Sequence, residues 1–163
     1  MKHFITAVML MFVGGPVSAQ NIELEVLFPQ VQCMALNVYY EARGSNLADK
    51  AAVADVVLNR VNDSRYPDTV CGVVKQGLQD ANGNMLRNKC QFSWYCDGKH
   101  DRPQDEDRWV EAQSIAWNMV EENKYRGITE GSTHYHATYV NPRWAKTLQL
   151  VGRIGAHIFY RWE

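Results

Sequence analysis

Residues 37–44 read NVYYEARG and place one acid, Glu41, directly behind two tyrosines in an otherwise apolar stretch. The stretch ends a predicted helix from Pro29 to Ala42, whose apolar residues recur at helical spacing. These residues are Val31, Met34, Ala35, Val38 and Ala42. At roughly 100° per residue, Glu41 projects about 20° from Met34, at the edge of the apolar stripe. Gly44 supplies a stop signal, so Glu41 is expected in the last turn and away from the fully solvated side.

The position of Glu41 allows two interpretations. A carboxyl group packed against apolar neighbours loses hydration, which raises its pKa and keeps it protonated near neutral pH. A protonated carboxyl group of this kind is the general acid that a glycosidic oxygen requires. Alternatively, Glu41 is solvated or paired with a cation in a structural network. Arg60 projects among the valines of the next predicted helix, so it should either turn outward or find an acidic partner, and Glu41 is a candidate for that partner.

The rest of the chain predicts helices followed by a β-rich end, which is an α+β, mainly α, single domain. A second helix is expected over residues 47–62, with Ser45 or Asn46 as its cap. Its polar side, opposite the valines, carries Asp55, Asn59 and Asn62.

Later segments have weaker patterns. They predict a short helix over 70–76, an exposed loop over 78–89, an aromatic loop with two cysteines over 90–104 and a helix over 104–123. Two segments with alternating apolar residues, 132–140 and 153–162, are each expected to form a strand. Their pairing would give a small antiparallel β element near the C-terminus.

Residues 1–19 have the three regions of a secretory signal peptide. A basic start at residues 1–3 precedes an apolar run over 4–13 and a small-residue cleavage site over 17–19. We therefore expect export to the periplasm, the extracellular space or the cell wall, with a mature domain of residues 20–163. The apolar run is too short to cross a bilayer comfortably, so no stable membrane span is expected after cleavage. A buried N-terminal helix and a retained anchor are the alternatives.

Four cysteines, Cys33, Cys71, Cys90 and Cys96, follow the predicted cleavage site. In an exported chain they predict two disulfides, and three pairings are open. Cys90 and Cys96 are close enough in sequence for a local loop. A zinc site is the competing interpretation, but the CxxC pair that would support it is absent. The formal net charge of −1 argues against a broad nucleic-acid-binding surface, and a monomer is expected.

Histidines and aromatic residues suggest further chemistry. His134 and His136 are two apart in a predicted strand and therefore face the same side. With Glu41 or His157 they form a possible metal site, although the spacing is not diagnostic, and we expect no metal and no cofactor. A cysteine nucleophile with a histidine base is another alternative, whereas GxSxG and P-loop motifs are absent. Aromatic rings near polar groups suit a sugar, which has apolar faces and polar edges.

Six blocks occur in the order ALNVYYEARG, AAVADVVLNRV, YPDTVCGVVKQ, CQFSWYCDG, STHYHATYVNPRWA and IGAHIFYRW. Together they resemble the SleB-type cell wall hydrolases, which are related to the spore-cortex-lytic enzymes. The resemblance runs from about Cys33 to Trp162, nearly all of the expected mature chain. It implies a lysozyme-like fold that cleaves the peptidoglycan glycan strand between N-acetylmuramic acid and N-acetylglucosamine. Ser45-Asn46 departs from the acidic residue that many relatives carry after the glycine, outside the catalytic position.

The resemblance also implies a mechanism. Glu41 matches the family's catalytic glutamate, and the members studied as enzymes look like lytic transglycosylases, which leave a 1,6-anhydromuramic end. Glu41 would act first as acid and then as base, so no second carboxylate is obligatory. A conventional glycosidase needs two carboxylates, and Asp55 and Asp97 are available, but neither is placed by its motif as such a partner. The candidate substrate-binding residues are Gln91, Phe92, Tyr135 and His136.

Two other functions compete with this one. The first is a non-catalytic peptidoglycan-binding module that reuses the fold. The second is a zinc-dependent amidase that uses His134, His136 and His157. Two biological settings fit an enzyme of this kind, a bacterium remodelling its own wall and a phage whose endolysin lyses its host.

Overall fold

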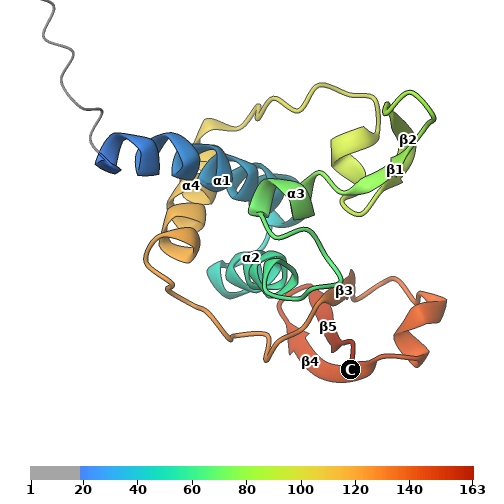
Figure 1. Ribbon diagram of the computed structural model, residues 1–163. Helices are drawn as coiled ribbons and strands as arrows, with labels where there is room; N and C mark the ends of the chain where they lie inside the picture. The colour runs from blue at the N-terminus through green and yellow to red at the C-terminus, as the bar shows by residue number, and fades with distance from the viewer. Residues whose placement is uncertain (1–18) are drawn as a thin grey trace, which may run out of the picture.

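The computed structural model describes residues 19–163, with side chains from Phe28 onward (Figure 1). Its helices are α1 (Ala19–Ala42), α2 (Leu47–Val61), α3 (Val70–Val74) and α4 (Glu106–Val120), with 3-10 turns at Ser93–Cys96 and Arg143–Lys146. Its strands are β1 (Gly77–Gln79), β2 (Met85–Cys90), β3 (His134–Ala137), β4 (Gln149–Ile154) and β5 (His157–Arg161). The α+β, mainly helical prediction is confirmed. Residues 1–18 of the predicted signal peptide lie outside the described residues.

Helix α1 begins earlier than predicted, at Ala19, and Pro29 lies inside it. The sequence prediction placed the start of this helix at Pro29, a residue that is favoured in the first turn of a helix. A proline inside a helix removes one backbone hydrogen bond and crowds the preceding turn, but its fixed φ is compatible with a helix, and α1 continues through Pro29. Its end at Ala42 agrees with the prediction. Among the described residues, no helix combines the length and apolar character needed to cross a membrane.

Helix α2 lies at the centre of the fold (Figure 1). The Asn46 side chain caps it by accepting the Asp49 N–H at 2.9 Å. Helices α1, α3 and α4 contact it on one side, and the sheet of β3, β4 and β5 lies on the other. Its polar side is therefore covered by protein, and Asp55 is fully buried although it lies opposite the valines. A buried charge needs a partner, and Lys50, also on α2, pairs with Glu111 of α4 at 2.5 Å.

The apolar core forms where the four helices meet. Helix α1 contributes Met34, Val38 and Tyr39, which are fully buried, and the other helices close around them. A smaller cluster joins α2 to the sheet through Ala52, Val56 and Phe159. The sheet is therefore anchored on α2, and this anchoring fixes where β3 passes the end of α1.

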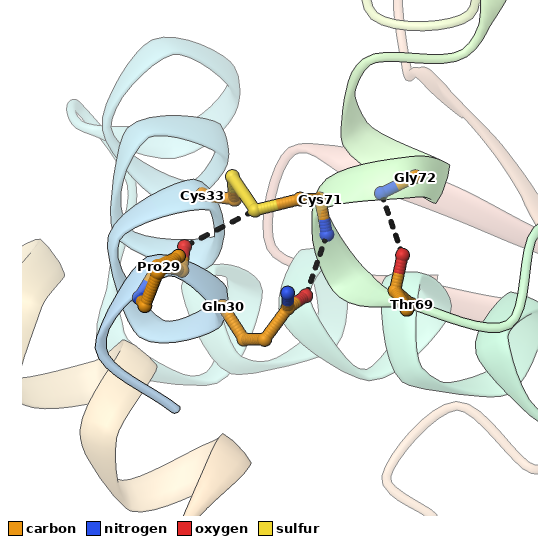
Figure 2. Close-up of a disulfide and its surroundings, with 6 residues drawn as sticks. All are labelled: Pro29, Gln30, Cys33, Thr69, Cys71 and Gly72. Carbon is orange, nitrogen blue, oxygen red and sulfur yellow. Dashed lines mark hydrogen bonds between the residues drawn. A yellow bond between two sulfur atoms is a disulfide. The ribbon is translucent and has the colours of Figure 1, made fainter. Parts of the chain in front are cut away.

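Two disulfides form, and they resolve the pairing that the sequence left open. Cys33 of α1 pairs with Cys71 of α3, and Cys90 pairs with Cys96. Figure 2 shows the first bridge, where the Gln30 side chain also accepts the Cys71 N–H at 2.9 Å. The Cys71 sulfur lies 3.1 Å from the Pro29 carbonyl oxygen, which is a contact and not a hydrogen bond because a disulfide sulfur carries no proton. Helix α3 is thus tied to α1 by covalent and polar links.

Residues 78–89 form most of a β-hairpin, so the loop prediction for them is wrong. Strands β1 and β2 pair antiparallel, and Asp80 Oδ1 accepts the backbone N–H groups of Asn82 and Asn84 in the turn. The hairpin residues are mostly exposed on both faces, so no alternation of apolar residues marked the strands. Gly77 is favoured there, because an added Cβ would lie 2.9 Å from the Cys90 sulfur, which is fixed by its disulfide, and 3.0 Å from the Cys90 Cα.

The C-terminal sheet has the order β3-β5-β4 and is antiparallel throughout. The single strand predicted over 153–162 is wrong, because the chain turns at Gly155, which has φ +55°, and β4 and β5 form a hairpin. An added Cβ at Gly155 would lie 2.7 Å from the Asp49 side chain, so the tight turn also needs a glycine. The predicted strand over 132–140 is present in shorter form as β3 and pairs with β5.

Candidate active site

Glu41 lies in the last turn of α1 and faces β3. Its side chain is half-buried, and the Tyr135 hydroxyl donates a hydrogen bond to Glu41 Oε2 at 3.1 Å. These two residues are 94 positions apart in the sequence, so only the packing of β3 against the helices joins them. The carboxyl group is thus partly removed from water and still partly accessible.

The electrostatics of Glu41 favour its protonated form. Loss of hydration raises its pKa, and this effect exceeds the opposing effects of the Tyr135 hydrogen bond and of the nearby His157 and Arg60. Desolvation and the Glu41 carboxylate in turn raise the pKa of Tyr135 well above its ordinary value, so the phenol keeps its proton and remains a donor. The arrangement combines a carboxyl group of raised pKa with a fixed neutral donor.

The sequence suggested that Glu41 and Arg60 could form an ion pair, but the two side chains do not pair with each other. Its Nε donates to the Thr133 carbonyl oxygen at 2.8 Å. Its guanidinium lies 5.3 Å from the ring centres of both Tyr66 and Phe92. Arg60 is therefore held by a carbonyl group and two rings, and it influences Glu41 only through its charge.

A buried pair of residues next to Tyr135 was not identified from the sequence. His157 Nδ1 lies 2.7 Å from Asp49 Oδ1, and Asp49 Oδ2 accepts the Ala156 N–H at 3.1 Å. The His157 ring packs edge-on against the Tyr135 ring, with centres 5.1 Å apart. His157, held by Asp49, thus packs against the Tyr135 ring and helps to fix its position. The acidic side chain of Asp49 could have served as a signal, but an acid in the first turn of a helix is also expected from the helix dipole alone.

The two tyrosines before Glu41 belong to the framework. The Tyr39 hydroxyl accepts the backbone N–H groups of Gln104 and Asp105 at 3.0 and 3.1 Å, at the start of α4. Tyr40 stacks on Trp94 with ring centres 4.8 Å apart. These contacts connect the end of α1 to two separate segments, and they hold the Glu41 backbone in place.

The predicted substrate-binding residues fall in different surroundings. Tyr135 contacts Glu41, as described above. Phe92 is buried against Arg60, whereas Gln91 is exposed and its N–H binds the Gln76 carbonyl oxygen at 2.9 Å. His136 lies on the opposite face of β3 from Tyr135, with its Nε2 3.0 Å from the Tyr160 hydroxyl. The structure therefore brings one of the four into contact with Glu41.

The three histidines of the amidase alternative do not converge. The rings of His134 and His136 both contact Trp144 on one face of the sheet. His157 lies on the other face, bound to Asp49. Within residues 19–163, as far as they are described, no three histidine, cysteine or acidic side chains form a group able to hold a metal ion.

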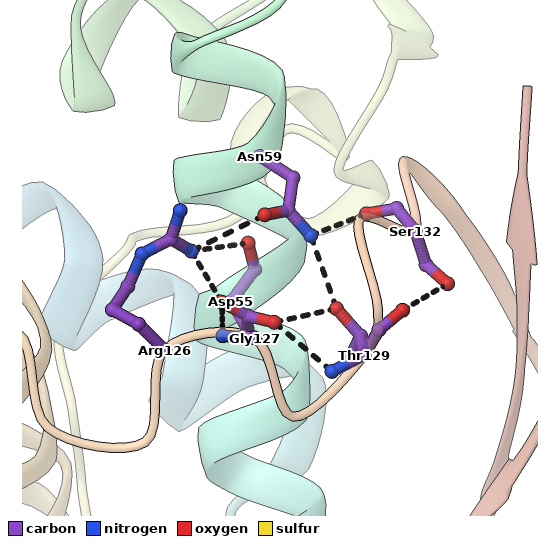
Figure 3. Close-up of polar contacts among 6 residues, drawn as sticks. All are labelled: Asp55, Asn59, Arg126, Gly127, Thr129 and Ser132. Atoms are coloured by element: carbon purple, nitrogen blue, oxygen red, sulfur yellow. Dashed lines mark hydrogen bonds and ion pairs between the residues drawn. The ribbon is translucent and has the colours of Figure 1, made fainter.

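Asp55, a possible second carboxylate, is occupied by a structural network (Figure 3). It accepts hydrogen bonds from the Thr129 N–H and hydroxyl at 3.0 and 2.6 Å, from the Gly127 N–H at 3.1 Å, and from Arg126. Asn59 extends the network to the Ser132 carbonyl oxygen at 2.9 Å. The network fastens the segment before β3 to α2 and thereby directs β3 toward Glu41.

A family profile described as Cell Wall Hydrolase matches residues 44–160, from Gly44, three residues after Glu41, to the last strand. The chain belongs to this cell wall hydrolase family. The resemblance inferred from the six sequence blocks is thereby confirmed. Glu41 itself lies before the matched range. The support for its role therefore comes from the geometry of the site and not from the profile.

Individual relatives agree with this family assignment. The chain is 52% identical over 134 residues to a spore cortex-lytic enzyme of Oceanobacillus iheyensis, a match over 79% of this chain and 40% of the relative. It is 31% identical over 142 residues to one of Halalkalibacterium halodurans, over 86% of this chain and 37% of the relative. The chain thus spans about two fifths of the length of these curated relatives.

Solved structures show the same fold. The catalytic domain of the germination-specific lytic transglycosylase SleB from Bacillus anthracis superimposes with a TM-score of 0.58 and 26% identity, covering 90% of this chain and 99% of that one. The catalytic domain of the Bacillus cereus SleB protein gives a TM-score of 0.56 and 26% identity, covering 81% and 89%. The cell wall hydrolase chain therefore has the fold of a SleB catalytic domain, as the resemblance implied.

Proposed function

We propose that this cell wall hydrolase cleaves the glycan strand of peptidoglycan between N-acetylmuramic acid and N-acetylglucosamine, as a lytic transglycosylase with Glu41 as its acid and base. The observation that carries the proposal is the state of Glu41. It is a half-buried carboxyl group with a raised pKa and one hydrogen-bond donor, Tyr135, in a chain of the cell wall hydrolase family. The name of the Bacillus anthracis structural relative supports the transglycosylase subtype.

The surroundings of Glu41 favour a mechanism with a single carboxylate. Among the described residues, the side chains that shift its pKa are Tyr135, His157 and Arg60, and none of these three carries a carboxyl group. Asp55 is fully buried within its own hydrogen bonds, and Asp97 accepts the Lys99 N–H at 2.8 Å. A hydrolase with two carboxylates would need a second acid near the scissile bond. A transglycosylase needs only the one that Glu41 supplies.

The proposed reaction has two proton transfers. Protonated Glu41 gives its proton to the glycosidic oxygen, the bond from this oxygen to the muramic C1 breaks, and the N-acetylglucosamine side leaves with a free hydroxyl. The substrate's own acetamido group stabilises the electron-poor C1. Ionised Glu41 then takes the proton of the muramic C6 hydroxyl as its oxygen attacks C1, which forms the 1,6-anhydro ring and restores the acid without consuming water. The Tyr135 hydrogen bond stabilises the ionised form between the two transfers.

We further propose that the enzyme acts outside the cytoplasm, as a monomer on glycan strands. The two disulfides support an oxidising compartment, because such bonds persist mainly there. The signal-peptide pattern of residues 1–19 supports the same location. Residues 20–163 would then be the catalytic domain.

Mass spectrometry of purified sacculi digested with the protein tests the function. The protein should release soluble muropeptides that end in 1,6-anhydromuramic acid. Glu41→Gln keeps the size of the side chain and removes proton transfer, so the release rate should fall by roughly 10²–10⁴-fold. Glu106→Gln, at an exposed glutamate in the first turn of α4, is the matched control and should retain full activity.

Other outcomes would replace the proposal. Reducing muramic ends in place of anhydro ends would make the enzyme a hydrolase. Near-normal release by the Glu41→Gln variant would remove Glu41 from the chemistry. Binding to sacculi with no soluble product would favour the non-catalytic module, and free peptides with intact glycan strands would favour an amidase.

A further inference from the structure

A hollow lies on the face of the C-terminal sheet that points away from Glu41. Its volume is about 340 Å³, and it is lined by His134, Trp144, Thr147, Leu148 and Trp162. The strand β3 divides the two sites, because Tyr135 faces Glu41 whereas His134 faces the hollow. The hollow is therefore separate from the catalytic carboxyl group and has no role in the mechanism described above.

The hollow combines aromatic faces with polar atoms that have no protein partner. The His134 ring lies between two indole rings, with centres 5.4 Å from Trp144 and 5.8 Å from Trp162. Trp162 is 47% exposed although it is large and apolar. Throughout the described part of the chain, neither indole N–H has a hydrogen-bond acceptor, and these two donors remain available to a ligand.

The polar groups of the hollow are held in fixed orientations. The Thr133 hydroxyl lies 3.0 Å from His134 Nδ1, which leaves the Nε2 atom of the same ring without a partner among residues 19–163. The Thr147 hydroxyl donates to the Trp144 carbonyl oxygen at 2.8 Å and can still accept. Desolvation, together with the charges of Arg60 and Arg65, lowers the pKa of His134 to about 4, so the ring is neutral at pH 7. The hollow thus presents uncharged donors and acceptors beside apolar rings.

We propose that this hollow is a second glycan-binding site, which holds an N-acetylhexosamine ring of the wall polymer away from the segment cleaved at Glu41. A sugar ring has an apolar face that packs on an indole and polar edges that need uncharged hydrogen-bonding groups. Both are present here, and no acid, lysine or arginine of residues 28–163 lines the hollow. Arg65, whose guanidinium lies 4.5 Å from the centre of the Trp162 ring, is already paired with Asp63. The proposal rests on the proposed function, since it takes peptidoglycan as the polymer.

A second site changes how the protein handles an insoluble polymer. While one segment of glycan occupies the hollow, the next encounter with Glu41 occurs at a high effective concentration. The hollow should therefore increase retention on sacculi and the rate of their digestion. It should have no effect on short soluble fragments, which cannot reach both faces of the sheet.

The test compares two tryptophan variants in two backgrounds. Trp162→Ala removes an exposed face of the hollow, and Trp117→Ala removes a tryptophan of similar exposure, 41%, on α4. In the Glu41→Gln background, sedimentation with purified sacculi should show roughly tenfold weaker binding for Trp162→Ala and no change for Trp117→Ala. Trp162→Phe, which keeps an aromatic face, should retain most of the binding. Circular dichroism confirms that each variant is folded.

With Glu41 intact, Trp162→Ala should digest sacculi more slowly but cleave short soluble glycan fragments at the normal rate. Equal binding of the Trp162→Ala and Trp117→Ala variants would overturn the second site, and muropeptide release would still show that the proposed function holds. If binding depended on Trp162 but no muropeptide appeared with Glu41 intact, the second site would stand and the proposed catalysis would fail.

Discussion

Two carboxyl groups on neighbouring helices, Glu41 of α1 and Asp55 of α2, have opposite surroundings. Asp55 is fully buried and accepts hydrogen bonds from three backbone or hydroxyl donors and from Arg126. Glu41 is half-buried and has one donor, the Tyr135 hydroxyl. The first group has every oxygen lone pair engaged by protein, and the second has most of its hydrogen-bonding capacity left for another molecule.

The difference shows that burial, together with the number of hydrogen-bond donors, distinguishes an acid with a structural role from one that is available to a substrate. A buried carboxylate with a full set of donors holds chain segments together. A desolvated carboxyl group with few donors keeps its proton and can therefore protonate a substrate. Its ionised form lowers the stability of the folded protein. The two groups are also linked, because the Asp55 network positions the segment that leads into β3 and thus Tyr135 (Figure 3).

The largest effect is expected on stability, at Asp55. Asp55→Ala leaves Arg126 and the buried Thr129 donors without their acceptor, which should lower the free energy of unfolding by about 3–5 kcal/mol. Urea denaturation followed by circular dichroism measures the loss. Asp63→Ala removes an acid that lies just after α2 and pairs with Arg65 near the surface, and it should cost much less. Equal losses for the two variants would contradict the structural role assigned to Asp55.

A smaller effect is expected at Tyr135. Tyr135→Phe removes the only donor to Glu41 among the described residues and should slow glycan cleavage by roughly 10–100-fold, since a hydrogen bond to a charged group contributes about 1.5–3 kcal/mol. The hydrogen bond lowers the pKa of Glu41, so its loss should raise that pKa further. Activity that needs protonated Glu41 should then persist to higher pH.

The pH–rate profile of Tyr135→Phe checks this expectation. Tyr139→Phe, at a tyrosine that is 90% exposed, is the control and should match the unmodified protein. An unchanged rate and an unchanged alkaline limb for Tyr135→Phe would show that the contact has no part in the reaction.

The smallest effect is expected on the stability of Glu41→Gln. The pKa of Glu41 is raised in the folded state, so the ionised form is less favourable there than in the unfolded chain. The contribution of Glu41 to stability is therefore full below about pH 4, its ordinary pKa range, and is lost as pH rises through the folded-state pKa. Glutamine has no charge to desolvate, so the variant should melt a few degrees higher at pH 8 and at the same temperature near pH 4. A lower melting temperature at pH 8 would contradict the desolvation of Glu41.

Several features of the fold were predictable from local patterns. The end of α1 at Ala42, the position of α2 and the presence of α4 follow from apolar residues at helical spacing and from stop signals. The projection that put Glu41 at the edge of the apolar stripe agrees with its half-buried state. The two hairpins were missed, because β1 and β2 are exposed on both faces and because Gly155 interrupts an alternation that looked continuous.

The sequence by itself determined the helical framework, the family and the acid on which the proposed chemistry depends. These features depend on residues close together along the chain, or on ordered blocks that need no three-dimensional information. Only the tertiary structure decided which cysteines pair, which side chain donates to Glu41, and which acid is structural. Apart from Cys90 and Cys96, the partners in these contacts are far apart in sequence, as Tyr135 and Glu41 are by 94 positions, and Asp55 and Thr129 by 74. Spacing within one helix or strand cannot specify such pairs, because they form only when the packed core brings separate elements together.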